Sequence, residues 1–176
     1  AADMGVDMIV LTGNPGVGVD NKAITKALAD LNEAVGDRVI LTAGKMHASG
    51  ILSEAGEKIL TKEDAETFIE AGADVLLLPA PGTVPGFTME HAAELIKTAH
   101  EKGVLAMTTI GTSQEGADEE TIRQIALMCK MAGADIHHIG DSGYMGMALP
   151  ENITAYSVAI RGKRHTYRRM AMSLVR

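Results

Sequence analysis

The chain has 176 residues, of which 46% are hydrophobic and 22% are charged, and its formal net charge is −7. This length suits one domain spanning 1–176, and the composition is typical of a globular protein with its own core. No apolar run approaches the roughly 18 residues that a transmembrane helix requires, so we expect no membrane span. The single cysteine, Cys129, excludes an internal disulfide and suits a reducing, cytoplasmic setting.

The first ten residues, AADMGVDMIV, resemble the last turn of a helix followed directly by a strand. The chain does not begin with Met, and natural domains rarely start in this way. We therefore expect the sequence to be a fragment of a longer protein.

Three segments, MGVDMIVLTG, AGADVLLLPA and AGADIHHIGD, repeat a glycine, an aspartate soon after it, and an apolar run. The glycine suits the C-cap of a helix. The apolar run suits a strand of a parallel sheet, which is buried on both faces. Together with two looser copies, the pattern predicts strands at about 8–12, 39–43, 75–79, 104–109 and 136–139.

Amphipathic patterns between these strands predict helices. The first runs from about Asn21 to Val35, and either Asp20 or Asn21 caps it. The second starts at Thr61, where Thr61 and Asp64 resemble a capping box. Further helices are predicted from Thr88 to before Gly103, from about Asp118 to before Gly133, and over about 152–160; a basic terminal helix is predicted over about 163–176.

The predicted strands start about 31, 36, 29 and 32 residues apart, which is the period of a βα unit. Such alternation implies a parallel sheet with right-handed crossovers. Five units cannot close a (β/α)8 TIM barrel, which has eight strands and typically ~250 residues. The abrupt start and the regular repeat favour an N-terminally truncated barrel with five βα units and about three strands upstream. An open doubly wound parallel sheet is the alternative.

In either architecture, ligands bind at the C-terminal ends of the strands. The first loop there, GNPGVGVD, places Gly13 and Gly18 at the spacing of a P-loop. However, Val19 and Asp20 stand where that loop requires Lys and Ser or Thr, so we do not expect a nucleotide site. Asn14 is a candidate to hydrogen-bond a substrate, although a tight loop capped by Asp20 explains this stretch equally well.

The second loop, TAGKMHASG, contains two candidate catalytic residues. Lys45 lies just past the strand end, where a lysine can hold a carboxylate or phosphate, or form a Schiff base if its pKa is lowered. His47 is a candidate acid–base group because the reference pKa of histidine lies near neutrality. An exposed loop histidine is the simpler reading of His47. The third loop, PAPGTVPGFT, has no ionisable group and is expected to form a wall or contact surface.

The fourth and fifth loops, TTIGTSQEG and IGDSGYMGM, would follow the last two strands of a barrel, where phosphate is commonly bound by backbone N–H groups. The candidates for binding phosphate or substrate in these loops are Gly111, Thr112, Ser113, Gly140, Ser142 and Gly143. Asp141 would repel phosphate, so we expect it to bind a hydroxyl or a metal, or to transfer a proton. Two glycine-rich turns without a ligand are the alternative interpretation.

His137 and His138 do not form a metal site together, because neighbouring residues on a strand point to opposite faces. One of them faces the barrel interior and is more simply explained as a packed, hydrogen-bonded histidine. The sequence contains neither H-E-x-x-H nor C-x-x-C, so no metal ligands are predicted.

The end of the chain is basic: residues 161–176 contain six Lys and Arg residues and no acid, which leaves 10 basic and 23 acidic residues, or −13, in residues 1–160. This segment has Tyr167 as its one aromatic residue and no zinc-finger or RNA-binding signature. We therefore expect a solvated helix or contact with an acidic partner, and not a nucleic-acid site.

The runs DMIVLTGNPGVGVDNKAI, LTAGKMHASG, GADVLLLPAPGTVPGFT and NITAYSVAIRGKRHTYRRMA are similar to a bacterial family of barrel proteins labelled phosphoenolpyruvate phosphonomutase-like, or haloacid dehalogenase-like hydrolase. The resemblance covers nearly the whole chain and implies a barrel that is longer at the N-terminus. A dehalogenase of that type would carry D-x-D after its first strand, and no D-x-D occurs. Phosphonomutases bind magnesium through acidic groups at strand ends, where only Asp141 stands here. Mg²⁺ would therefore need acidic ligands from upstream strands.

These observations predict an enzyme of the lyase or isomerase type that acts on a C–C or P–C bond of a small phosphorylated or carboxylated metabolite. Lys45 would hold or activate the substrate, and His47 or Asp141 would transfer protons. The alternative is a non-catalytic domain that binds an anionic metabolite or forms an oligomer. A five-stranded piece of a barrel exposes two sheet edges, so we expect self-association or association with the missing N-terminal portion.

Overall fold

The computed structural model describes residues 1–47, 51–140 and 148–173. Within these ranges, five parallel strands form one sheet in the order β1–β2–β3–β4–β5, with bounds Met8–Thr12, Ile40–Gly44, Val75–Pro79, Leu105–Ile110 and Ile136–Ile139. The helices are α1 (Asn21–Val35), α2 (Lys62–Glu70), α3 (Met89–Glu101), α4 (Glu119–Ala132) and α5 (Pro150–Ser173). The predicted strands and the βα alternation are confirmed, with bounds that differ by no more than one residue.

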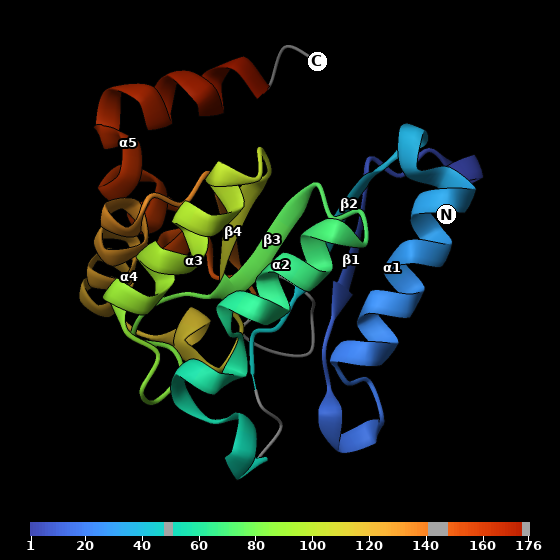
Figure 1. Cartoon of the computed structure of the whole chain (residues 1–176). Coiled ribbons are helices and arrows are strands. Elements are labelled where there is room, and N and C mark those ends of the chain that lie inside the picture. Colours follow the sequence, from blue (N-terminus) through green and yellow to red (C-terminus); the bar gives the residue numbers. More distant parts are fainter. Residues whose placement is uncertain (48–50, 141–147, 174–176) are drawn as a thin grey trace.

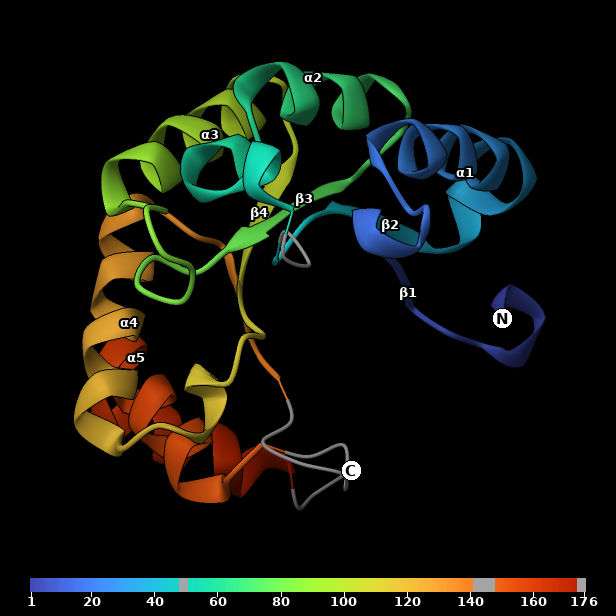
Figure 2. The same ribbon diagram turned by 90° about the horizontal axis from the view of Figure 1, so that it is seen from below.

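The sheet curls into an open arc, and all five helices lie on its convex side (Figures 1 and 2). A doubly wound sheet reverses its strand order and carries helices on both faces. Here the spatial order follows the chain order and the helices cover one side, which is the arrangement of a TIM barrel. The fold is therefore a truncated (β/α) barrel of five units, and the open-sheet alternative is wrong.

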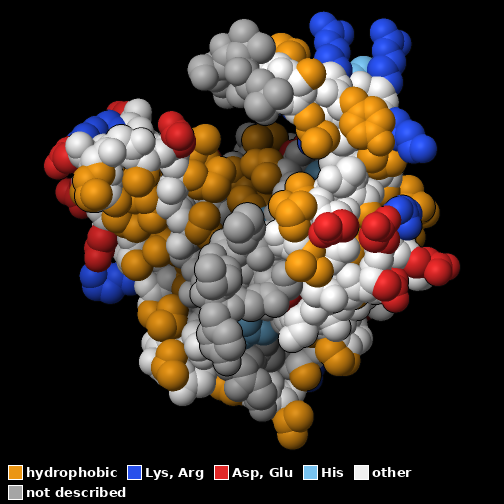
Figure 3. All heavy atoms as spheres, turned by 180° about the vertical axis from the view of Figure 1, so that it is seen from behind, with side chains coloured by type: hydrophobic (Ala, Val, Ile, Leu, Met, Phe, Trp, Pro, Cys, Tyr) orange, Lys and Arg blue, Asp and Glu red, His pale blue; other side chains and the backbone are white. Residues whose placement is uncertain are grey.

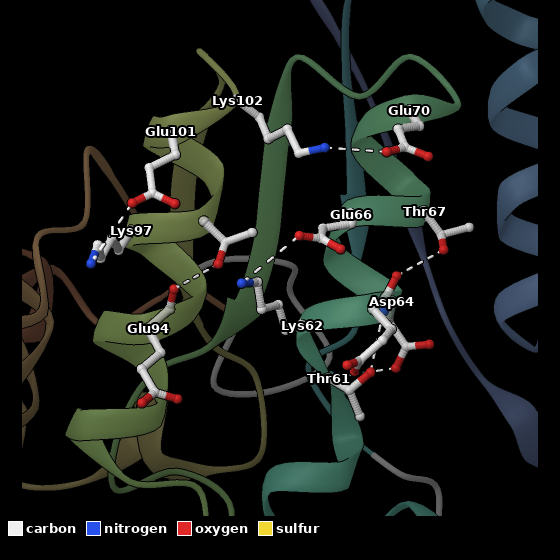
Figure 4. Close-up of polar contacts among 12 residues, drawn as sticks. Thr61, Lys62, Asp64, Glu66, Thr67, Glu70, Glu94, Lys97, Glu101 and Lys102 are labelled. Carbon is white, nitrogen blue, oxygen red and sulfur yellow. Dashed lines mark hydrogen bonds and ion pairs between the residues drawn. The ribbon is translucent and has the colours of Figure 1, made fainter.

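The helix starts follow from capping side chains that the sequence indicates. The Asp20 carboxylate accepts a hydrogen bond from the backbone N–H of Ala23 at 2.9 Å. At the start of α2, the Thr61 hydroxyl accepts from Asp64 N and the Asp64 carboxylate accepts from Thr61 N, which confirms the capping box (Figure 4). The outer surface here is charged, as in the exposed pair Lys102–Glu70, and such exposed pairs contribute about 1 kcal/mol at most.

The main core lies between the convex side of the sheet and the helices. Under α1 to α3 it contains Ile24, Leu28, Leu41 and Leu76, which are fully buried or nearly so. A second cluster joins β4 and β5 to α4 and α5, and it includes the buried Cys129. The helices are thus held by their apolar stripes, and the strand ends are fixed relative to one another.

The concave face of the sheet is apolar and only partly covered. The strand register places Val10, Thr42, Val75 and Leu105 in one row across this face. Val10, on the edge strand β1, is 46% exposed, and Leu105, at the start of β4, is 48% exposed. Figure 3 shows hydrophobic side chains gathered in a hollow on this side of the molecule. In a complete barrel, the corresponding face would be enclosed by the remaining strands.

The helix α5 contains a break at Gly162, whose φ of 78° and ψ of 162° are not helical. The break divides α5 into a segment that packs on α4 and a basic segment that continues beyond it (Figure 1). None of the helices in the described ranges is long and apolar enough to cross a membrane.

Candidate functional site

A polar cavity of about 470 Å³ lies at the C-terminal ends of β2, β4 and β5. Its ionisable side chains come from three different loops or strands: His47 after β2, Glu115 after β4, and His138 on β5. The remaining lining residues are Met46, Gly111, Ile139, Gly140 and Ala148. This is the end of a barrel at which catalytic groups are found, and it brings together groups that are distant in sequence.

Glu115 is positioned by contacts to its own backbone. It lies in a short 3-10 turn, Gln114–Gly116, after β4. The buried amide of Asn152, from the first turn of α5, donates to the carbonyl oxygens of Glu115 and Ala117 at 2.8 and 2.9 Å. The Glu115 Oε2 atom is buried and has no hydrogen-bond partner among the described residues. A buried carboxylate oxygen without a partner is costly, which indicates a group poised for a ligand or a proton.

His138 lies in the uppermost row of the concave face. The register aligns it with Thr109 on β4, which in turn is aligned with Pro79 on β3. Burial lowers the pKa of His138 below its ordinary value of 6.5, and the negative charge of Glu115 offsets part of this effect. At neutral pH, the imidazole is therefore neutral and offers one N–H donor and one acceptor nitrogen.

The neighbouring His137 points the other way, toward the helices. Its Nδ1 atom lies 3.3 Å from the Tyr156 hydroxyl and 3.5 Å from the Thr108 hydroxyl. Burial and the positive charge of Arg161 lower the pKa of His137, while Asp135 raises it in part. The prediction that the two histidines face opposite sides is confirmed, and it is His138 that faces the barrel interior.

We expect the melting temperature to fall when the pH is lowered below 6.5, the ordinary pKa of His137 and His138. Both pKa values are lowered by folding, so the unfolded chain binds more protons in this range and is favoured as pH falls. One such group changes the free energy of unfolding by at most about 1.4 kcal/mol per pH unit. Thermal melts between about pH 8 and pH 5 at constant ionic strength measure this dependence. His137→Gln, which cannot titrate there, should flatten it; an unchanged slope would contradict the assignment.

The structure places Lys45 outside the polar cavity and outside a second, apolar cavity that lies beside it at this end of the sheet. Its side chain is 1% exposed, and its Nζ atom lies 2.5 Å from Oε2 of Glu54, which belongs to the turn Leu52–Glu54. A Cβ on Gly13 would stand 2.9 Å from Lys45 Cγ and 3.2 Å from Ile24 Cδ1 of α1, so these residues share one small space on the helix side of the sheet. The catalytic role of Lys45 stays a prediction, and its position favours a role in holding the loop after β2.

The other candidates from the sequence fall into three groups: residues that line the polar cavity, residues that lie elsewhere, and residues outside the described ranges. Gly111 and Gly140 line the polar cavity, while Thr112 lines a separate apolar cavity beside it. Ser113 is exposed and has a left-handed φ of 80°. Asn14 forms a backbone bridge with Val19 and lines neither cavity. Asp141, Ser142 and Gly143 lie outside the described residues.

Sequence reasoning missed two residues of the polar cavity, Glu115 and His138. Glu115 is the one acidic residue between β4 and the capping Asp118, which was a usable signal. His138 could not be assigned to the cavity without knowing which side chains of the four-residue strand β5 point to the concave face. Among the described residues, no group of three or more His, Cys, Asp or Glu side chains is arranged to hold a metal ion. The described part of the site therefore does not by itself fit Mg²⁺.

Comparison with known proteins supports the barrel. A candidate N-acetylmannosamine-6-phosphate 2-epimerase of Haemophilus influenzae is 34% identical over 89 residues, which is 51% of this chain and 33% of that protein. The chain's match thus spans about a third of the length of this curated relative. Among solved structures, the deoxyribose phosphate aldolase of Aeropyrum pernix has a TM-score of 0.56 at 15% identity and is matched over 88% of this chain and 70% of its own.

A candidate phosphonomutase of Burkholderia cenocepacia has a TM-score of 0.61 at 19% identity, with 90% of this chain and 68% of that chain covered. At these identities, the solved structures show a shared fold. The family assignment comes from a different comparison, which covers the whole sequence: the chain belongs, over residues 1–176, to the family described as "Domain of unknown function (DUF7916)".

Proposed function

We propose that this chain forms the larger part of a barrel enzyme of the lyase or isomerase type that acts on a small phosphorylated or carboxylated metabolite. One observation carries the proposal: Glu115, with a buried carboxylate oxygen that has no partner among the described residues, shares a cavity at the C-terminal ends of the strands with His138 and His47. The names of the similar proteins (an epimerase of a sugar phosphate, an aldolase of a sugar phosphate and a phosphonomutase) support the reaction class and the anionic substrate.

The proposed step is removal of a proton from the carbon beside a carbonyl group. Glu115 accepts this proton, and the electron pair of the C–H bond moves into the carbonyl, so that negative charge develops on its oxygen. The neutral His138 donates its N–H to this oxygen and stabilises the charge. Return of a proton to the opposite face of the carbon gives an epimer. In the lyase reaction, the substrate carries a hydroxyl on the next carbon, and Glu115 instead accepts the proton of that hydroxyl. The electron pair of the C–C bond then moves into the carbonyl, the hydroxyl-bearing carbon leaves as an aldehyde or ketone, and protonation of the resulting enolate completes the reaction.

The anionic group of the substrate binds, in this proposal, to the loops after β4 and β5. Gly111, Thr112 and Ser113 offer backbone N–H groups and small side chains. We retain Gly140, whose own N–H donates to Ile110 O at 2.8 Å, together with Ser142 and Gly143 as further candidates. The Glu115 carboxylate repels an anion, so the anionic group sits away from it, toward the outer rim of these loops. Asp141, which lies outside the described residues, remains a candidate proton carrier, as does His47.

The test is exchange of carbon-bound hydrogen with D2O, followed by NMR for pyruvate, dihydroxyacetone phosphate and an N-acetylhexosamine 6-phosphate. Glu115→Gln should reduce the exchange rate by about 10²- to 10⁴-fold, the range expected for loss of a general base. Glu120→Gln makes the same change at an exposed residue of α4 and should leave exchange unchanged. Equal exchange in the wild type and in Glu115→Gln would overturn the assignment of the base.

The alternative proposal is a non-catalytic domain that binds an anionic metabolite. A thermal-shift titration with phosphate, phosphoenolpyruvate and pyruvate distinguishes the two, since ligands of the native state raise its melting temperature. Saturable shifts without hydrogen exchange would favour binding alone. Neither shift nor exchange, in a protein that melts cooperatively, would remove both proposals for this chain.

We also expect the isolated chain to self-associate, or to associate with an N-terminal portion that supplies further strands. Its concave face exposes Val10, Ile40 and Leu105, and both edge strands lack a second neighbour within the described sheet. Light scattering measures the molar mass of the assembly in solution. The double variant Val10→Lys/Leu105→Lys should lower that mass toward the mass of a monomer. A monomer whose mass these substitutions leave unchanged would contradict the expectation.

A further inference from the structure

A second cavity, of about 490 Å³, lies beside the polar one, and its lining is apolar. It is formed by the loops after β2, β3 and β4. Its apolar side chains are Ile51, Leu52, Ala55, Val84 and Pro85, and its other lining residues are His47, Gly56, Thr83, Thr112 and Gln114. None of these ten residues is Asp, Glu, Lys or Arg. A charged group placed here would lose its hydration without gaining an ion-pair partner from the lining.

The hydroxyl groups of Thr83 and Thr112 in this lining already have hydrogen-bond partners within the protein. The buried Thr83 hydroxyl donates to Ala80 O at 2.7 Å. The Thr112 hydroxyl lies 2.7 Å from Thr83 O and 2.8 Å from the Oε1 atom of the Gln114 side chain. A hydroxyl has one proton, so if Thr112 donates it to Thr83 O, the Gln114 amide must be turned by 180°, which exchanges its O and N positions and presents its NH2 group to Thr112. The Gln114 carbonyl then remains for one hydrogen bond to an occupant.

The outer wall of this cavity is formed by close contact between two loops. A Cβ on Gly86 would stand 3.2 Å from the Cα of Gly56, and both residues have left-handed φ values, 78° and 63°. A larger residue at Gly86 would press on the backbone of Gly56, and a larger residue at either position would strain its own left-handed turn. The close approach of the two loops thus depends on Gly56 and Gly86.

The apolar cavity adjoins the polar cavity. His47 lines both of them. The loop after β4 contributes to both cavities: Gly111 and Glu115 line the polar cavity, whereas Thr112 and Gln114 line the apolar one. A molecule whose reacting carbon lies beside Glu115 can therefore extend past His47 into the apolar cavity.

We propose that the apolar cavity binds an uncharged, largely apolar arm of the substrate, such as a short acyl or alkyl amide. This inference rests on the proposed function for the reacting end of the same substrate. The Gln114 carbonyl accepts the amide N–H of the arm, and the alkyl part lies against Ile51, Ala55 and Val84. The substrate class is thereby narrowed to anionic carbonyl metabolites that carry an acylated or alkylated substituent.

Saturation-transfer NMR tests the inference with butyramide and hexanamide, compared with butyrate and butylammonium as charged molecules. The amides should bind saturably, with affinity rising about three- to fourfold for each methylene that becomes buried. Ala55→Trp fills the cavity from its exposed rim and should abolish amide binding. Met131→Trp, at a position 70% exposed on α4, is the matched control and should bind as the wild type does. Gln114→Glu adds a charge to the lining and should weaken binding of the amides.

Charged molecules that bind as tightly as the amides, or amide binding that Ala55→Trp leaves unchanged, would overturn the inference. The result is separable from the proposed function, because Glu115→Gln should stop hydrogen exchange and leave hexanamide binding intact. Hexanamide binding that depends on Ala55, without hydrogen exchange in any carbonyl compound, would support the apolar site and count against the proposed reaction. Hydrogen exchange without amide binding would support the proposed reaction and count against the apolar site.

Discussion

Replacing Glu54 with Leu should lower the free energy of unfolding by about 3 to 5 kcal/mol, the usual cost of removing one partner of a buried ion pair. The Lys45 ammonium is enclosed, since the side chain is 1% exposed, and Glu54 Oε2 at 2.5 Å is its ion-pair partner. Leu keeps the volume of the site but supplies neither charge nor acceptor. Chemical denaturation with linear extrapolation measures the difference.

The complementary change, Lys45→Met, should cost less than Glu54→Leu. Glu54 has a side chain that is 27% exposed, so its carboxylate can turn toward water when the lysine is gone. The double variant Lys45→Met/Glu54→Leu should recover most of the stability lost in Glu54→Leu, because it leaves no unpaired charge inside the protein. A cost below about 1 kcal/mol for Glu54→Leu would show that Lys45 finds another partner or water, and the ion pair would then not hold the loop.

The same variants distinguish two roles for Lys45. If its role is to hold the loop after β2, the double variant keeps hydrogen exchange, since Glu115 and His138 are untouched. If Lys45 takes part in the reaction, Lys45→Met and the double variant both lose exchange, whatever their stability. The placement of the side chain beside Ile24 on the helix side of the sheet favours the first outcome.

Local sequence signals predicted the elements of the fold well, for reasons that the structure makes clear. Thr61 and Asp64 are three residues apart and cap α2 with no help from distant residues. Gly133 has the left-handed φ that its place after α4 suggested. The apolar run of β3, and that of β4 after the exposed Leu105, are buried on both faces because helices cover one side and the curled sheet covers part of the other. These features depend on neighbours within a few residues.

The candidate site was harder to predict because it depends on which side of a strand each residue faces. Lys45 follows β2 directly and was expected at the site, yet one position separates it from Met46, which lines the polar cavity. His138 and His137 differ in the same way. Glu115 reaches the cavity because Asn152, 37 residues later, holds its backbone. Such long-range contacts leave no local pattern in a single sequence.

The strand pairing beside Lys45 leads to a second large effect: Gly44→Ala should destabilise the protein by about 4 kcal/mol or more, in the range of severe single substitutions. A Cβ on Gly44 would stand 1.8 Å from the carbonyl oxygen of Leu77, its registered partner on β3. The obstacle is backbone and not a side chain that could rotate, so β2 and β3 must separate. Total stabilities are typically 5 to 15 kcal/mol, so the variant should be largely unfolded or close to unfolding.

Gly103→Ala is the matched control, because it separates lack of space from backbone strain. Gly103 has a φ of +80°, and nothing lies within 4 Å of the position its Cβ would take. Its substitution should therefore cost only about 1 to 2 kcal/mol, the usual cost of a left-handed conformation. Circular dichroism and denaturation of both variants provide the comparison. If Gly44→Ala were as stable as Gly103→Ala, β2 and β3 would not lie in this close register, and the arrangement that fixes both Lys45 and the cavity beside it would have to be revised.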